Sequence, residues 1–280
     1  MAMFSKLDST VWLIFLAFPL CPAYGFDGPL RSTPAISFTA SEACIPGPAV
    51  WATRGNIGNP TVSVTSLLTP RNVERAYEQA ERDLAGNKFQ DAEREVTNAL
   101  AIYPNSAVAW CLMGTLREQQ LQLDEAFTDY SRALLIDSHL LPAYLGLARI
   151  AFLGHKWQEV VQLTDKVVIL NPLSSPVAYL YNAATNFNMA NLTAAEISAR
   201  RFQALDTAHE RPQVYLLLGD ILAFERDYAG AAEQKKTFLT IVPNGYDARE
   251  IKEQVSVLES LLSRRSEPCC DGEQVSAASG

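Results

Sequence analysis

The sequence contains 280 residues, of which 48% are hydrophobic and 19% are charged. This composition is typical of globular proteins and excludes a chain that is disordered along its whole length. The 31 acidic residues outnumber the 23 Lys and Arg residues, and the resulting formal net charge of −8 argues against nucleic acid or an anionic membrane as the main partner.

The first 25 residues have the pattern of a secretory signal peptide. A short segment with Lys6 precedes the apolar run 11–20, and the small residues Ala23 and Gly25 suit a cleavage site. The apolar run is shorter than the roughly 20 residues that a membrane helix needs. The sequence therefore predicts export to a periplasmic or secreted location, without membrane insertion of the cleaved chain. The alternative is an uncleaved signal segment that acts as an anchor.

Residues 26–70 are rich in Pro, Ser and Thr and lack a helical period, although 61–65 alternate like a short strand. We expect this segment to be mostly linker. Export also permits disulfides among Cys44, Cys111, Cys269 and Cys270, and their spacing leaves the pairing open.

Small residues recur at a fixed interval from residue 71 onward, which is the signature of a repeat architecture. The interval is 34 residues in two series, Ala92, Ala126, Val160 and Ala99, Ala133, Val167. Pro104 and Pro172 lie two intervals apart. Pro243 follows after two intervals plus three residues, and we place this three-residue insertion near 207–211. Apolar residues within each unit have helical spacing, so each unit is predicted to be a helical hairpin.

The second unit carries Trp110, Gly114, Ala126, Tyr130 and Ala133, and this spacing resembles the tetratricopeptide repeat as it occurs in exported bacterial proteins. The resemblance implies an all-α fold, a right-handed α-solenoid of about five helical hairpins. An amphipathic helix at 246–264 is expected to cap it, so that the solenoid covers 71–264 and a disordered tail covers 265–280. The register of the fourth unit stays open: either Asn182 and Arg201 or, one residue later, Ala195 and Phe202 occupy repeat positions.

In this repeat family the first helix of each hairpin lines a concave groove that binds a protein or peptide. Carried onto this sequence, the resemblance implies a partner-binding groove that includes Tyr77, Glu118, Arg149, Phe152, Tyr179, Asn186, Phe187, Asp220 and Phe224. Polar members of this set would bond to a peptide backbone, and aromatic members would hold its side chains. The alternative for Phe152, Phe187 and Phe224 is packing between adjacent hairpins.

Catalytic patterns are missing from the sequence, and we expect no catalytic residue, metal or cofactor. His139, His155 and His209 fall in predicted turns that are far apart along the repeats. Two hypotheses remain. The first is an exported, non-catalytic scaffold that binds a protein or peptide in its groove, as an envelope assembly or adaptor factor. The second is a self-associating structural module whose groove is filled by another copy, in a homo-oligomer, or by its own N-terminal segment.

Overall fold

The computed structural model describes residues 70–173, 175–245 and 248–266, and within these ranges the regular structure is entirely helical. The predicted signal peptide, nearly all of the 26–70 segment and most of the predicted tail lie outside the described residues. The same is true of Cys44, Cys269 and Cys270. Cys111 is described, and it is a buried free thiol.

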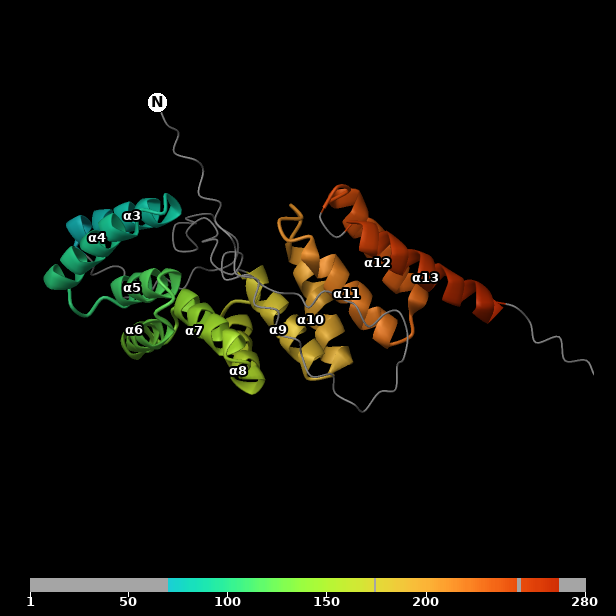
Figure 1. The fold of residues 1–280 in the computed structure, drawn as a ribbon. Coiled ribbons are helices and arrows are strands. Elements are labelled where there is room, and N and C mark those ends of the chain that lie inside the picture. Colours follow the sequence, from blue (N-terminus) through green and yellow to red (C-terminus); the bar gives the residue numbers. More distant parts are fainter. Residues whose placement is uncertain (1–69, 174, 246–247, 267–280) are drawn as a thin grey trace, which may run out of the picture. The chain divides into compact units, whose positions relative to one another are not determined.

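Five consecutive helical hairpins and one further helix make up the described chain (Figure 1). The hairpins are α3 (Arg71–Ala85) with α4 (Phe89–Ile102), α5 (Ala107–Gln119) with α6 (Leu123–Ile136), α7 (Leu141–Leu153) with α8 (Trp157–Leu170), α9 (Pro176–Asn188) with α10 (Leu192–Leu205), and α11 (Gln213–Phe224) with α12 (Tyr228–Ile241). The second helix of each hairpin also packs against the next helix in the chain, which for α12 is α13 (Ala248–Ser266). The predicted all-α solenoid is confirmed.

The turn inside every hairpin has the same backbone conformation. Its left-handed residue, with φ between 55° and 65°, is Asn87, Leu121, His155, Ala190 or Arg226. The following amide closes each turn onto the first helix, as in the 2.8 Å bond from the Gln122 N–H to the Arg117 carbonyl. Side chains with a Cβ adopt this conformation at a cost of about 1–2 kcal/mol each. Five such residues in equivalent turns show that the repeat geometry, rather than local preference, decides their conformation.

Small residues let the helices of each hairpin approach closely. Ala92, Ala126, Val160, Ala195 and Ala231 occupy equivalent places on the second helices and are all fully buried. In the second hairpin, a Cβ added at Gly114 would lie 2.9 Å from the Tyr130 ring. A Cβ added at Gly146 in the third hairpin would lie 2.3 Å from the same ring. The Tyr130 ring therefore fills the space that two glycines leave.

The turn residues fix the repeat register that the sequence left open. Their successive steps are 34, 34, 35 and 36 residues, so one extra residue precedes the fourth hairpin turn and two more precede the fifth. Placing all three extra residues near 207–211 was wrong. The later register holds in the fourth unit, because Ala195 and Phe202 are buried whereas Arg201 is exposed.

The last described helix, α13, closes the array with one apolar face. Ile251, Val255 and Leu258 are buried, whereas Lys252 and Glu253 are exposed. A terminal helix with a polar outer face meets the requirement of a repeat array, whose last hairpin would otherwise expose an apolar face.

Candidate functional site

All nine predicted groove residues lie on the first helices of the hairpins, namely α3, α5, α7, α9 and α11. Their side chains differ in what they contact. Tyr77, Glu118, Asn186 and Asp220 are buried, and Arg149, Phe152, Tyr179 and Phe187 are partly buried. Phe224 is 55% exposed.

Glu118 and Arg149 form a bidentate pair between the second and third hairpins. Arg149 Nε donates to Glu118 Oε1 at 2.7 Å, and Arg149 Nη2 donates to Glu118 Oε2 at 2.6 Å. The Tyr130 hydroxyl donates to Glu118 Oε2 at 2.7 Å. Burial and the Glu118 carboxylate raise the pKa of Tyr130, which keeps this donor protonated. The carboxylate and the guanidinium are therefore already paired inside the stack.

Asn186 and Asp220 are likewise bonded inside the stack. Asn186 Nδ2 donates to Asn182 Oδ1 at 2.8 Å, and Asn191 Nδ2 donates to Asn186 Oδ1 at 3.1 Å. Lys235 Nζ donates to Asp220 Oδ1 at 2.5 Å. These contacts use the groups that we expected to bond a peptide backbone. Asp220 joins α11 to α12, whereas Asn186 is bonded within α9 and the turn that follows it.

The two tyrosines of the predicted set make hydrogen bonds between successive hairpins. The Tyr77 hydroxyl bonds the Ser106 hydroxyl at the start of α5. The Tyr179 hydroxyl donates to the Pro172 carbonyl at 3.1 Å, in the connection that precedes α9. Trp110 makes the same contact with the Pro104 carbonyl at 3.0 Å. Tyr179 is thus the repeat's large packing residue, and its inclusion among groove residues followed from the earlier of the two registers.

The three phenylalanines lie at the C-terminal ends of α7, α9 and α11. Phe152 packs edge-to-face on Trp157 and Tyr181, with ring centroids 5.3 and 5.4 Å apart. Phe187 and Phe224 pack on each other, with centroids 5.5 Å apart. Phe152 contacts the next hairpin through Tyr181, and Phe187 and Phe224 join the fourth and fifth hairpins, so all three pack between adjacent hairpins, as the alternative interpretation has it. Phe224 rests on Phe187 but leaves half of its surface in solvent, and we call these two residues the phenylalanine pair.

Acidic side chains lie along one face of α3. Glu74, Glu78 and Glu81 are spaced four and three residues apart, so they share a helix face. Burial and the neighbouring Glu78 carboxylate raise the pKa of Glu81 to about 7. Arg71, Arg75 and Arg82 are interleaved with these glutamates on α3, so the helix carries charges of both signs, whereas the phenylalanine pair is apolar.

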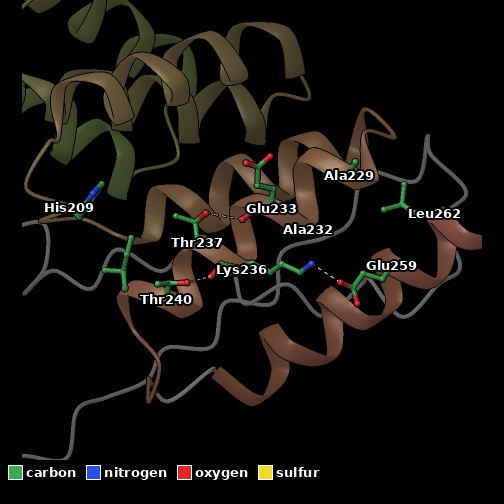
Figure 2. A pocket seen from close by; sticks show the side chains of 10 residues that line it. His209, Ala229, Ala232, Glu233, Lys236, Thr237, Thr240, Glu259 and Leu262 are labelled. Carbon is green, nitrogen blue, oxygen red and sulfur yellow. Dashed lines mark hydrogen bonds and ion pairs between the residues drawn. The ribbon is translucent and has the colours of Figure 1, made fainter.

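A cavity of about 680 Å³ lies between α12 and α13 (Figure 2). Ala229, Ala232, Ile241 and Leu262 contribute apolar lining, and His209 contributes to the lining from the connection before α11. Lys236 Nζ pairs with Glu259 Oε1 across the cavity at 2.7 Å (Figure 2). The hydroxyls of Thr237 and Thr240 donate to backbone carbonyls of their own helix (Figure 2). The Lys236 and Glu259 side chains are both more than half exposed, so the cavity is open to solvent, and it includes none of the predicted groove residues.

Among the described residues, no three His, Cys, Asp or Glu side chains are grouped so as to hold a metal ion. Over the same ranges no helix is both long and apolar enough to span a bilayer.

The buried polar partners of the fourth and fifth hairpins were not predicted from the sequence. Asn182 bonds Thr164 Oγ1 and Ser198 Oγ, and Lys235 bonds Gln254 Oε1 at 2.7 Å. A signal for Lys235 was available, because it occupies the repeat position that holds Tyr130 in the second hairpin. A charged residue at such a buried position requires a partner.

No protein-family model matches the sequence, and no curated protein does. Solved structures do resemble the described fold. One, from a functional characterisation of Pseudomonas aeruginosa PilF, has a TM-score of 0.58 at 18% identity and covers 70% of this chain and 92% of its own. PilW, a type IV pilus biogenesis factor, has a TM-score of 0.56 at 15% identity and covers 70% of this chain and 94% of its own. A tetratricopeptide repeat protein from Parabacteroides merdae has a TM-score of 0.54 at 14% identity and covers 70% of this chain and 76% of its own.

Proposed function

For a chain with a tetratricopeptide-repeat fold, we propose the function of an exported, non-catalytic scaffold that binds a protein or peptide on the first helices of its hairpins, as an envelope assembly or adaptor factor. The observation that carries this proposal is the phenylalanine pair. Large aromatic side chains contribute strongly to the energetics of protein interfaces, because a partner that covers an exposed ring buries a large apolar area.

The polar contacts support a binding surface that is rigid before the partner arrives. Two buried ion pairs, Glu118 with Arg149 and Asp220 with Lys235, hold packed helices in place. The exposed Phe224 ring packs on Phe187. A preorganised surface loses little conformational entropy on binding, so an exposed ring there contributes more affinity than a mobile one.

The phenylalanine pair supports a partner of particular chemistry, because an exposed ring that rests on a second ring favours an apolar anchor. We therefore propose a partner segment with aliphatic or aromatic residues toward α9 and α11.

Export is proposed from the N-terminal sequence alone, since residues 1–25 have a signal-peptide pattern. A non-catalytic role is supported by the buried polar groups, which bond to one another rather than converging on an open site. His139, His155 and His209 lie in three separate connections between helices.

Affinity capture from the native compartment tests the proposal with two matched variants. Phe224→Ser removes the exposed ring, and Ile102→Ser removes a side chain that is equally exposed, at 54% against 55%, at the end of α4. We expect Phe224→Ser to weaken capture of the main partner by about tenfold or more. Ile102→Ser should leave capture unchanged, and both variants should keep the circular dichroism spectrum of the wild type. Equal capture by Phe224→Ser and the wild type would refute the proposal.

A further inference from the structure

The connection between α12 and α13 contains the only Asn-Gly pair of the sequence, Asn244 and Gly245. Six residues, 242–247, join these two helices, whereas four residues, 103–106, join α4 to α5. The Asn244 side chain is exposed, and within the described residues it has no hydrogen-bond partner. Nothing in this part of the chain therefore keeps the Asn244 side chain from turning toward the peptide bond that follows it.

The Gly245 amide, which forms that peptide bond, is weakly held. Its nitrogen lies 3.5 Å from the Val242 carbonyl oxygen, whereas the other backbone bonds of the described turns and connections measure 2.7–3.2 Å. A hydrogen bond of this length is weak. Glycine also has no Cβ, so its backbone adopts conformations that other residues rarely reach, and no side chain shields its nitrogen. The Gly245 nitrogen is thus accessible to the Asn244 side-chain carbonyl.

A second asparagine in an equivalent connection provides an internal comparison. Asn105, between α4 and α5, follows a proline and is exposed, as Asn244 is. The next residue differs, because Ser106 is 3% exposed and its hydroxyl accepts from the Ala109 N–H at 3.0 Å. The backbone after Asn105 is therefore fixed by its own side chain, whereas the backbone after Asn244 is not.

We propose that Asn244 is a site of spontaneous deamidation. The Gly245 nitrogen attacks Asn244 Cγ, the new bond from nitrogen to Cγ replaces the bond from Cγ to Nδ2, and ammonia leaves with the Gly245 amide proton. The product is a cyclic succinimide, which water opens at either of its two carbonyls. Opening at Cγ gives an aspartyl residue, and opening at the main-chain carbonyl gives an isoaspartyl residue. Asparagine is among the residues that heat and time alter chemically, and the reaction consumes only water.

The two products differ in their effect on the capping helix α13. The Gly245 carbonyl accepts the Ala248 N–H at 3.0 Å, so Gly245 belongs to the turn in which this helix begins. An aspartyl carboxylate is compatible with that turn, because negative charge is favourable near a helix N-terminus. An isoaspartyl residue adds one methylene to the main chain and displaces the turn that positions the buried Ala248 and Ile251. Isoaspartyl formation therefore weakens the docking of α13, and this effect is independent of the proposed binding surface.

Ageing of the full chain in mildly alkaline buffer, below its melting temperature, tests the proposal. Peptide mass spectrometry follows Asn244 in the tryptic peptide 237–249 and Asn105 in the tryptic peptide 95–117. Methyl transfer by an isoaspartyl methyltransferase detects the isoaspartyl product in each peptide. Asn244→Gln keeps an amide but requires a larger ring, and Asn244→Asp carries the charge of the aspartyl product without lengthening the main chain.

Deamidation should add about one dalton to peptide 237–249 and should proceed at least about tenfold faster at Asn244 than at Asn105. Asn244→Gln should abolish the isoaspartyl signal in that peptide. Aged wild type should melt at a lower temperature than fresh wild type, whereas aged Asn244→Gln and fresh Asn244→Asp should melt like fresh wild type. Equal conversion of Asn244 and Asn105, or no isoaspartyl residue in peptide 237–249, would overturn the proposed site. Conversion of Asn244 without a change in melting temperature would overturn its effect on α13.

Discussion

The buried ion pair between Asp220 and Lys235 provides a sharp test of how the last hairpin is held to the capping helix. The Lys235 side chain is 3% and the Asp220 side chain 9% exposed, and Nζ lies 2.5 Å from Asp220 Oδ1 and 2.7 Å from Gln254 Oε1. At an effective dielectric constant of about 20, two charges at this distance attract by about 6–7 kcal/mol, which offsets only part of the desolvation, since burial raises the pKa of Asp220 in spite of the lysine. Removing one charge leaves the other buried and unpaired.

We therefore expect Asp220→Asn to lower the free energy of unfolding by about 3–5 kcal/mol. Adding Lys235→Met to that variant should restore at least about 2 kcal/mol, because the unpaired ammonium is then gone. Urea unfolding followed by circular dichroism measures both changes. As a control, Arg249 and Glu253 on α13 form a 3.1 Å pair with side chains 93% and 66% exposed, and Glu253→Gln should change stability by less than about 0.5 kcal/mol.

A cost of under about 1 kcal/mol for Asp220→Asn would contradict this expectation, since the buried ammonium would then tolerate the loss of its partner. A double variant that is less stable than Asp220→Asn alone would contradict it as well. That result would mean that Lys235 contributes through its packing rather than through its charge.

Three further predictions each concern one residue. Gly146→Ala should lower the unfolding free energy by about 1–3 kcal/mol in a urea titration, because the new Cβ would lie 2.3 Å from the Tyr130 ring, and no loss would contradict the close packing. Glu81 has a pKa raised to about 7 by its burial and by Glu78, so the folded chain binds a proton more tightly than the unfolded chain. Stability from this group is full below the ordinary pKa of 4.5 and is lost as the pH rises to about 7, and Glu81→Gln should remove that part of the pH dependence in thermal melts at pH 5 and pH 8. Leu121 has φ of 61°, so Leu121→Gly should raise the unfolding free energy by about 1 kcal/mol, whereas a lower melting temperature would show that its side chain makes a needed contact.

The sequence was sufficient for the repeat and for the core because both depend on periodic side-chain size. Ala92, Ala126 and Val160 had to be small wherever two helices cross, and they could be identified by their interval alone. The capping helix was predictable for a similar reason, since Ile251, Val255 and Leu258 follow one helix face.

The candidate site was predictable only as a set of helix positions. Sequence spacing placed Glu118, Arg149 and Asp220 on the first helices, but it gave no information about what each side chain contacts on the neighbouring helices. The structure pairs them with groups 31 residues away, for Glu118 with Arg149, and 15 residues away, for Asp220 with Lys235. Paired side chains cannot be distinguished from free ones until the distances between packed helices are known.

The amino-acid sequence by itself determined the repeat period, the helices and the apolar faces through which the helices pack, because these follow from local spacing and side-chain volume. Tertiary structure alone decided the register of the fourth hairpin, the internal pairing of buried charges, and which apolar groups, Phe224 and Leu135 among them, remain in solvent. Those outcomes depend on distances between hairpins, and one inserted residue in a connection is enough to change which side chains face each other.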